Sequence, residues 1–314
     1  MTTRWDRIIV FSGTSTIDLS HQICSELGVP PGLVEITRFG NDNTFVQIQE
    51  NVREADVFVV QTSCPPVNDR LMELLILIDA LKRSSARRIT AVLPYFPYVR
   101  SDKKDAPRIP ITARLVADLV TAAGAHRVLT MDLHAPQIQG FFNIPTDQLE
   151  ALPLLCDAIQ ELQAHDLVVV ASDVGRANFA RDYAHRLNAD LALGDKKRQG
   201  DVVDVFGIIG DVKGKDVVIV EDEIASGRTI AATARVLREN GARQIFVTAT
   251  HAIFTAQAPS TLNQEGLSRI VVTNTVPVLE VTEPDRLQVV SVAPLFAQAI
   301  KRIHDGDSVS SLFS

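Results

Sequence analysis

Two acidic residues stand at the end of an apolar run, directly before a turn that contains serine and glycine. Run and turn together, residues 218–229, read Val-Ile-Val-Glu-Asp-Glu-Ile-Ala-Ser-Gly-Arg-Thr. The carboxylates of Glu221 and Asp222 can accept hydrogen bonds from hydroxyl groups, and backbone N–H groups at a helix start bind phosphate. The pattern favours a site for a phosphorylated sugar. The alternative is a set of polar residues that only cap an ordinary helix.

Further polar groups follow other predicted strands. They are the charged stretch 98–105, the stretch 131–142 with His134, the stretch 171–175 with Asp173, and the basic stretch 195–201. Arginine, lysine and carboxylates suit a polyphosphate with a divalent cation, and a mobile basic loop can stabilise a transferring phosphoryl group. Each stretch alone also has a structural explanation: a solvated charge run, a hydrogen-bonded loop histidine, an N-cap or a basic hairpin loop.

Short β-rich apolar runs alternate with helical patterns, which predicts an α/β fold with mainly parallel central sheets. Predicted strands lie at 7–11, 33–38, 44–49, 56–60, 88–93, 127–131, 167–171, 190–194, 205–209, 217–221, 244–249, 270–274 and 288–292. Predicted helices lie at 18–28, 67–84, 111–123, 153–164, 174–188, 229–240 and 294–304. The polar groups above therefore fall at strand ends, where open α/β sheets bind ligands.

The length of 314 residues favours two domains over one. An internal similarity supports this, because a helix ends at Gly124 and again at Gly241, and His-Ala follows ten residues later in both places. We expect two related halves, 1–148 and 149–314, divided near a polar connection at 145–153. In this division, the last residues of the chain can pack back on the N-terminal half.

Composition restricts the class of protein. The chain is 46% hydrophobic and 22% charged with a net charge of −7, which argues against nucleic-acid binding and against a polybasic membrane patch. No apolar run approaches transmembrane length and the N-terminus does not read as a signal peptide, so we expect a cytoplasmic protein. Cys24, Cys64 and Cys156 have no metal-ligand spacing and are predicted to be buried free thiols.

Over essentially the whole chain the sequence resembles the ribose-phosphate pyrophosphokinases, also called phosphoribosyl-diphosphate synthetases. The most specific stretch is 132–142, Asp-Leu-His-Ala-Pro-Gln-Ile-Gln-Gly-Phe-Phe. Further similar stretches are 11–13, 68–75, 91–98, 102–105, 272–275 and 308–313. The resemblance implies two phosphoribosyltransferase-type halves. It also implies transfer of the diphosphoryl group of ATP to the 1-hydroxyl of ribose 5-phosphate, giving 5-phosphoribosyl 1-diphosphate and AMP.

The resemblance assigns site residues by position. Residues for ATP are Phe39, Asn41, Asp42, Asn43, Arg100, Ser101, Lys103 and His134. Residues for ribose 5-phosphate are Arg198, Glu221, Asp222, Ala225, Ser226, Gly227, Arg228 and Thr229. His134 and Asp173 match Mg²⁺-associated positions, and Lys196 and Arg198 match a catalytic loop. A homo-oligomer, often a hexamer built from dimers, and regulation by phosphate or ADP are implied as well.

The chain departs from the usual family sequence at several positions. Ala225 replaces the third acid of the sugar turn, Arg228 and Arg176 each replace a glycine, Asn43 replaces a glutamate and Ser101 replaces a glutamine. We expect an active synthetase with altered nucleotide preference. The alternatives are a non-catalytic nucleotide-binding homologue that regulates a synthetase, and a phosphoribosyltransferase that consumes the diphosphate with a nucleobase.

Overall fold

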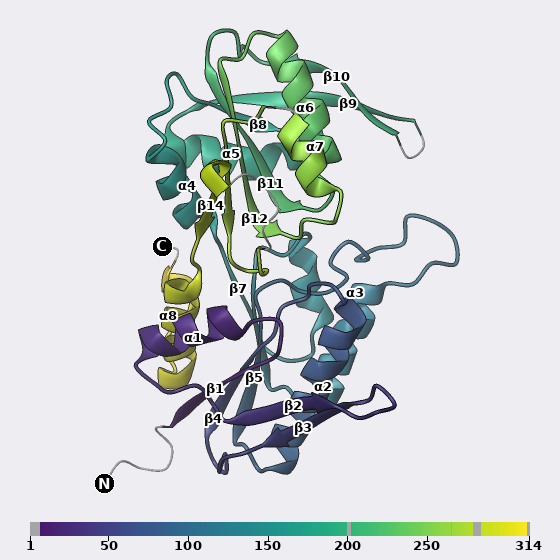
Figure 1. Ribbon diagram of the computed structural model, residues 1–314, viewed down its shortest axis with the longest axis vertical. Helices are drawn as coiled ribbons and strands as arrows, with labels where there is room; N and C mark the ends of the chain where they lie inside the picture. The colour runs from purple at the N-terminus through teal and green to yellow at the C-terminus, as the bar shows by residue number, and fades with distance from the viewer. Residues whose placement is uncertain (1–6, 200–201, 265, 279–283, 313–314) are drawn as a thin grey trace. The chain divides into compact units, whose positions relative to one another are not determined.

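The computed structural model describes residues 7–199, 202–264, 266–278 and 284–312, and of residues 196–199, 202–206, 264 and 284 only the backbone. These residues form two compact units. The first unit holds the described residues up to Glu150, then Thr275–Pro277, and those from Ser291 onward. The second holds Ala151–Asn274 and the described residues from Val278 to Val290. Both are built on mainly parallel sheets with helices (Figure 1), which confirms the predicted α/β fold class.

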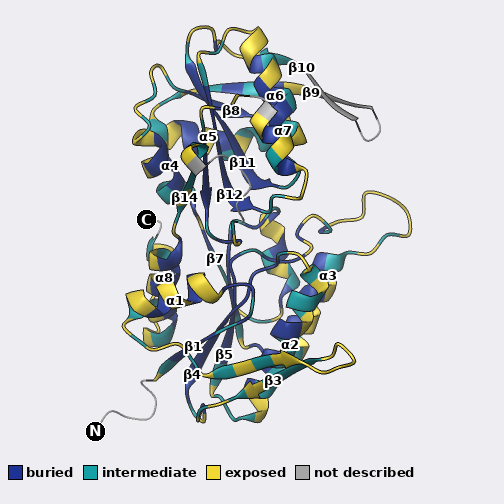
Figure 2. Cartoon of the chain, viewed as in Figure 1, coloured by how far each residue is buried: buried dark blue, intermediate teal, exposed yellow. Residues whose placement is uncertain are grey.

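The first unit is built on a five-stranded sheet in the order β1-β4-β5-β6-β7. Neighbouring strands in it are parallel. They are β1 (Ile8–Ser12), β4 (Asp56–Val60), β5 (Arg88–Leu93), β6 (Arg127–Met131) and β7 (Thr146–Leu149). The middle strands are apolar and almost entirely buried (Figure 2), as expected of a parallel sheet that helices cover on both faces.

Four helices and a hairpin complete the first unit among the described residues. Helices α1 (Ile17–Leu27) and α8 (Ala293–Asp305) pack together on one face of the sheet, and α2 (Val67–Arg83) and α3 (Thr112–Ala123) cover the other (Figure 1). The hairpin of β2 (Val34–Arg38) and β3 (Thr44–Ile48) lies against α2. Leucine and isoleucine side chains on one stripe of α2 fill the core beneath it, namely Leu74, Leu77, Ile78 and Leu81.

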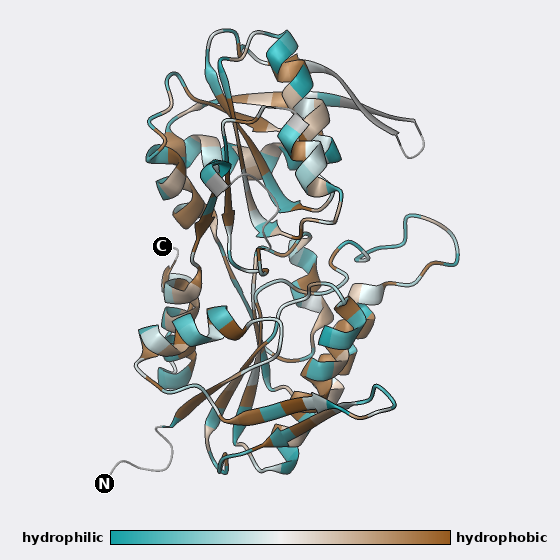
Figure 3. Ribbon diagram, viewed as in Figure 1, coloured by the Kyte–Doolittle hydropathy of each residue, from teal (hydrophilic) through white to brown (hydrophobic). Residues whose placement is uncertain are grey.

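The second unit is built on a seven-stranded sheet in the order β10-β9-β8-β11-β12-β13-β14. Its strands are β8 (Val168–Ala171), β9 (Asp190–Gln199), β10 (Val202–Ile209), β11 (Asp216–Ile224), β12 (Gln244–Ala252), β13 (Arg269–Thr273) and β14 (Leu287–Val290). Of these, β10 runs antiparallel to β9 and the other neighbours are parallel. The central strands are among the most hydrophobic parts of the unit (Figure 3), and β11 is buried along its whole length.

Helices cover both faces of this second sheet as well. Helices α4 (Leu152–Gln160) and α5 (Ala177–Leu187) pack together, as do α6 (Arg228–Glu239) and α7 (Ala258–Gln264). The two pairs lie on opposite sides of the sheet in Figure 1. Short 3-10 turns connect several elements, including η2 (Val174–Arg176) and η1 (Pro136–Phe141). Strands β8 and β11 each lead at the carboxyl end into a turn and a helix.

Three local predictions are wrong. The polar connection predicted at 145–153 contains β7, whose residues Thr146–Leu149 pair with β6 although only one of the four is apolar. Helix α7 was not expected, because its sequence Ala-Pro-Ser-Thr-Leu-Asn-Gln carries little apolar periodicity. The basic stretch 195–201 is not simply a loop, since residues 195–199 extend β9 and pair with β10. Residues 200–201 lie outside the description.

All three cysteines are free, as expected. Burial raises the pKa of Cys24 to about 11 and that of Cys156 to about 12. The prediction of burial is wrong for Cys64, which is half-buried, although desolvation still raises the pKa of its thiol. Among the described helices, none combines the length and the apolar character needed to cross a membrane.

Candidate functional site

The acidic pair of the second unit lies inside strand β11 and not in the turn after it. β11 pairs with β8 through Val220 and Ala171, so that the next residues, Glu221 and Ser172, also lie together. The hydroxyl of Ser172 donates a hydrogen bond to Glu221 Oε1, and both residues are buried. Asp222 is buried too, at 5% exposure. The carboxyl ends of β8 and β11 thus present polar groups at one edge of the sheet.

Arg176 joins the ends of these two strands. Its Nη2 lies 2.6 Å from Asp222 Oδ2, and the side chains are 20% and 7% exposed. Burial opposes the charge of the guanidinium, yet the pKa of Arg176 is raised because Asp222, Glu221 and Asp173 surround it with negative charge. Asp173 caps η2, since its Oδ1 accepts a hydrogen bond of 3.1 Å from the backbone N–H of Arg176. Asp173, Glu221 and Asp222 therefore all lie around Arg176.

The turn between β11 and α6 depends on a glycine. Gly227 has φ of +74°, a left-handed conformation, and a Cβ placed there would lie 2.9 Å from the side chain of Leu262. Ala225 accepts a hydrogen bond of 3.0 Å from the N–H of Thr255, which ties the turn to the segment after β12. Helix α6 begins at Arg228, one residue before the predicted start, and Arg228 is exposed.

The first N–H groups of a helix have no partner within that helix. Ser226 and Thr229 flank the start of α6 and are both partly exposed. The backbone N–H of Arg228 lies 3.5 Å from the hydroxyl of Ser226. This end of α6, which follows the acidic pair in the sequence, therefore combines amide and hydroxyl donors of the kind that bind phosphate.

Strand β9 passes close to the same edge. A Cβ at Gly194 would lie 2.7 Å from the carbonyl oxygen of Ser172, so glycine permits this close approach. The strand then continues into the predicted catalytic residues, whose backbones pair Lys196 with Val205 and Arg198 with Val203 of β10. The side chains of Lys196 and Arg198 lie outside the described part of the chain.

In the first unit, the residues predicted for the nucleotide base lie at the tip of the β2–β3 hairpin. Phe39 and Asn43 close the tip with a backbone hydrogen bond of 2.9 Å, and Asp42 has φ of 66°. The ring of Phe39 is 56% exposed and lies 5.3 Å from that of Phe45. The side-chain oxygen of Asn41 faces the N–H of Asn43 at 3.4 Å. An exposed aromatic ring with amide groups beside it can stack on a base.

The residues predicted for the ATP phosphates lie in loops after β5 and β6. Arg100 and Lys103 are exposed, whereas Ser101 and His134 are partly buried. The backbone of Ser101 accepts a hydrogen bond from Ala113 at the start of α3. The two loops are joined by Gln137, which donates a hydrogen bond of 2.9 Å to Asp102.

The first turn of α2 connects the hairpin tip to the phosphate loop. Asp69 pairs with Arg38 next to the tip, at 2.5 Å, and Asn68 accepts a hydrogen bond from the hydroxyl of Tyr98. The two segments predicted for ATP are thus anchored on adjacent residues of one helix. Asn68 and Asp69 were recognised only as part of a family motif, and their tethering role depends on tertiary contacts.

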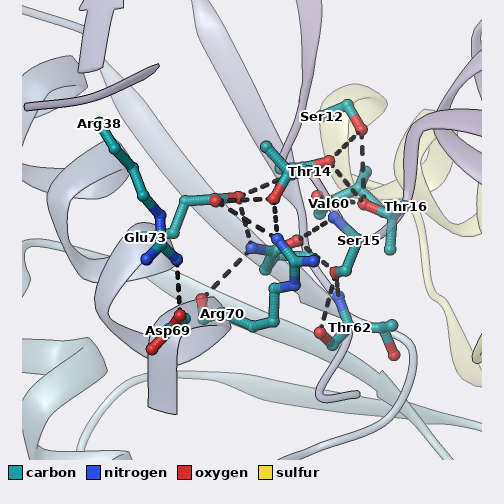
Figure 4. Close-up of polar contacts among 12 residues, drawn as sticks. Ser12, Thr14, Ser15, Thr16, Arg38, Val60, Thr62, Asp69, Arg70 and Glu73 are labelled. Carbon is teal, nitrogen blue, oxygen red and sulfur yellow. Dashed lines mark hydrogen bonds and ion pairs between the residues drawn. The ribbon is translucent and has the colours of Figure 1, made fainter. Parts of the chain in front are cut away.

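A buried polar cluster next to this turn was missed by sequence reasoning (Figure 4). Glu73 accepts hydrogen bonds from the N–H and hydroxyl of Thr14, at 2.6 and 2.7 Å, and from Gln61 at 2.7 Å. Arg70 reaches both Thr14 and Glu73. In the sequence, the signal for this cluster is the carboxylate of Glu73, which directly precedes Leu74 at the start of the apolar stripe of α2. The cluster joins the ends of β1 and β4 to that helix.

Among the described residues, no group of three or more His, Cys, Asp or Glu side chains has the arrangement of a metal site. Asp173 offers a carboxylate, the kind of ligand that Mg²⁺ prefers, whereas the imidazole of His134 is a less typical ligand for that ion. Mg²⁺ is commonly held by one or two carboxylates together with substrate phosphates. The carboxylate of Asp173 by itself therefore suits a metal that also binds nucleotide phosphates, and not a preformed protein cage.

Comparison with known proteins gives consistent matches along the chain. A family model for the N-terminal domain of ribose phosphate pyrophosphokinase matches residues 8–124, and one for a phosphoribosyl synthetase-associated domain matches residues 202–314. A ribose-phosphate pyrophosphokinase of Nostoc sp. is 50% identical over 98% of this chain and 94% of its own length. One from Caldanaerobacter subterraneus is 48% identical and covers 97% of each chain.

A solved structure agrees. The crystal structure of phosphoribosylpyrophosphate synthetase from Mycobacterium smegmatis matches with a TM-score of 0.90 and 41% identity, covering 96% of this chain and 99% of that one. With two α/β units and polar groups at the carboxyl ends of their strands, the chain is an enzyme of the transferase type. It belongs to the ribose-phosphate pyrophosphokinase family.

Proposed function

We propose that this chain transfers the diphosphoryl group of ATP to the 1-hydroxyl of ribose 5-phosphate, giving 5-phosphoribosyl 1-diphosphate and AMP. The observation that carries the proposal is the 50% identity to a named pyrophosphokinase over nearly the full length of both proteins. In the reaction the 1-hydroxyl oxygen loses its proton and bonds to the β-phosphorus, the bond from that phosphorus to the α–β bridging oxygen breaks, and AMP and a proton leave. The protein's task is mainly positioning and charge neutralisation.

The second unit would bind ribose 5-phosphate at the carboxyl end of β11. The buried carboxylates of Glu221 and Asp222 would accept hydrogen bonds from the 2- and 3-hydroxyls. The turn of Ala225, Ser226 and Gly227, with the start of α6 at Arg228 and Thr229, would hold the 5-phosphate through N–H and hydroxyl donors. Arg228 is exposed at the start of this helix.

The first unit would bind ATP. Phe39 would stack on the base while Asn41, Asp42 and Asn43 at the hairpin tip contact its polar edge. Arg100, Ser101, Lys103 and His134 would bind the phosphates from the loops after β5 and β6. Asn43 and Ser101 replace a glutamate and a glutamine of the usual sequence, and an amide both donates and accepts hydrogen bonds. We therefore expect GTP or another triphosphate to compete better with ATP than in a typical relative.

Mg²⁺ would bind together with the phosphates of ATP and neutralise charge on the transferring group; the family resemblance assigns His134 of the first unit and Asp173 of the second to Mg²⁺-associated positions. Lys196 and Arg198 would meet the same charge from the β9–β10 hairpin. Assembly into a homo-oligomer, a cytoplasmic location, and regulation by phosphate or ADP belong to the same proposal. They rest on the family resemblance.

A donor panel tests the function. The purified protein is incubated with ribose 5-phosphate, Mg²⁺ and ATP, GTP, CTP or UTP in turn, and nucleoside monophosphate and phosphoribosyl diphosphate are measured. The proposal expects both products in equal amounts with at least ATP, loss of both in Lys196→Ala, and normal yield in Lys213→Ala on the exposed turn before β11. No product with any donor would overturn it.

Ala225, Arg228 and Asn43 favour one second candidate, a nucleotide-binding homologue that regulates a true synthetase. This candidate predicts nucleotide binding without turnover in the same panel. A phosphoribosyltransferase would instead release pyrophosphate only when a nucleobase is added.

A further inference from the structure

Arg176 is not among the residues that have been assigned a role so far. Its side chain is partly buried, whereas that of Arg228 in the predicted ribose site is exposed. Arg176 ends the short η2 turn, immediately before α5, and its guanidinium lies against Asp222 at 2.6 Å. Its backbone N–H is held by Asp173, through both Oδ1 and the carbonyl oxygen, each at 3.1 Å. The side chain therefore reaches across from the end of β8 to the end of β11 on a fixed backbone.

Arg176 and a neighbouring amide together fix the plane of the Asp222 carboxylate. Oδ2 faces Arg176, and Oδ1 accepts a hydrogen bond of 2.9 Å from the N–H of Glu223. With a contact at each of its two oxygens, the carboxylate is held in one orientation. This is what recognition of a particular hydroxyl requires.

The charges around Arg176 explain why such a residue is useful here. Asp173, Glu221 and Asp222 all act on the guanidinium, and two of these acids are buried. Buried carboxylates that lie close together repel one another and need a paired cation to stay in place. Removing one partner of a buried pair leaves the other charge uncompensated. Without Arg176, Asp222 is expected to turn away from its present orientation.

We propose that Arg176 is a positioning residue that orients Asp222 toward the sugar, and that it thereby sets how strongly this enzyme recognises the vicinal hydroxyls of its pentose phosphate. The inference rests on the proposed function for the identity of the sugar. It goes beyond that function because none of the roles proposed there involves Arg176.

The test compares Arg176→Gln and Arg176→Lys with the wild-type enzyme. Arg186→Gln is the matched control, since Arg186 on the following helix makes an exposed pair of 3.5 Å with Asp157. Steady-state kinetics are measured with ribose 5-phosphate and with 2-deoxyribose 5-phosphate at saturating ATP. Calorimetric binding of ribose 5-phosphate without nucleotide is measured alongside, and thermal unfolding verifies that each variant is folded.

In Arg176→Gln we expect the KM for ribose 5-phosphate to rise about tenfold or more, in line with the loss of a charge-assisted contact, while the KM for ATP changes little. The preference for ribose over deoxyribose should fall, and Arg176→Lys should restore part of both. Arg186→Gln should match the wild type. A folded Arg176→Gln variant with unchanged or lower KM and unchanged sugar preference would overturn the inference.

The two proposals fail in different ways. A wild-type protein that turns over no donor contradicts the proposed function, and the calorimetric arm then still decides whether Arg176 supports sugar binding. A wild-type protein that is active beside an Arg176→Gln variant of equal affinity contradicts only the present inference.

Discussion

Strand β11 carries a buried aspartate near each end, and each is paired with an arginine. At the amino end, Asp216 is fully buried and accepts hydrogen bonds from Arg243 Nε at 2.8 Å and from the N–H of His165 at 2.8 Å. At the carboxyl end, Asp222 faces Arg176. The first pair ties neighbouring segments of the fold together. The second lies beside a left-handed turn and a helix start, where ligands bind in such sheets.

The first unit has a similar division. At the amino end of β4, Asp56 pairs with Arg88 of β5 and with His304 of α8, whose Nδ1 lies 2.8 Å away. Beyond the carboxyl end, Gln61 joins the polar cluster around Glu73. Similar contacts thus lie in different surroundings at the two ends of a strand. At the amino end they tie neighbouring segments of the fold together, and at the carboxyl end they lie near residues predicted to bind the substrates. Four predictions test this difference.

The largest effect is expected from Asp222→Asn. An amide removes the charged acceptor and leaves Arg176 facing a neutral group, so kcat/KM for ribose 5-phosphate should fall about 100-fold. Steady-state kinetics measure this, with Asp157→Asn as the control because Asp157 is exposed and its ion pair is weak. If the folded Asp222→Asn enzyme kept the kcat/KM of the wild type, the carboxyl end of β11 would not be part of the sugar site.

The amino-end pair should behave in the opposite way. Arg243→Ala leaves the buried charge of Asp216 without its guanidinium, and we expect the free energy of unfolding to fall by about 2 kcal/mol. Urea unfolding measures this loss. At a temperature where the variant is folded, its KM for ribose 5-phosphate should stay within about twofold of the wild type. If its KM rose as much as that expected for Arg176→Gln, the amino-end pair would also affect substrate binding, and the difference between the two ends of β11 would be contradicted.

Two glycines flank β11 with the same backbone conformation, φ of +74°. Gly214→Ala and Gly227→Ala should each lose about 1 kcal/mol of unfolding free energy, because a side chain strains the left-handed conformation. A Cβ at Gly214 meets open space, whereas one at Gly227 meets Leu262 at 2.9 Å. Only Gly227→Ala should therefore weaken ribose 5-phosphate binding in calorimetry. Equal affinities in the two variants would argue against the turn as the phosphate site.

The smallest effect is expected when the usual family residues are restored in the turn. Ala225→Asp with Arg228→Gly should change kcat by about threefold or less, because Arg228 is exposed and a third acid adds repulsion beside a phosphate. Steady-state rates of the double variant and of each single variant decide this. A large rise in rate would show that the altered turn limits this enzyme.

Much of the fold was predictable because buried parallel strands read as continuous apolar runs. β4 and β8 have the sequences Asp-Val-Phe-Val-Val and Val-Val-Val-Ala, and both were predicted closely. β7 and α7 were missed because Thr-Asp-Gln-Leu and a seven-residue helix give almost no periodic signal. Their formation depends on neighbours that sequence reasoning does not place.

Site residues that belong to a sequence motif could be predicted. Site residues whose contacts depend on the tertiary structure could not. Asp173, Glu221 and Asp222 were selected from their places after apolar runs, and the structure brings them together. Arg176 was recognised only as a departure from the family sequence, since nothing in the sequence shows that it reaches Asp222. The assigned roles of all these residues remain predictions.

The most direct test of the account is amide hydrogen exchange of the full-length protein with and without ribose 5-phosphate. If the sugar phosphate binds at the carboxyl ends of β8 and β11, exchange should slow in peptides covering 172–176 and 225–231. Exchange in peptides covering 212–216 and 241–244, around Asp216 and Arg243, should stay unchanged. Protection confined to the amino end of β11, or no protection in either region at saturating ligand, would contradict the account.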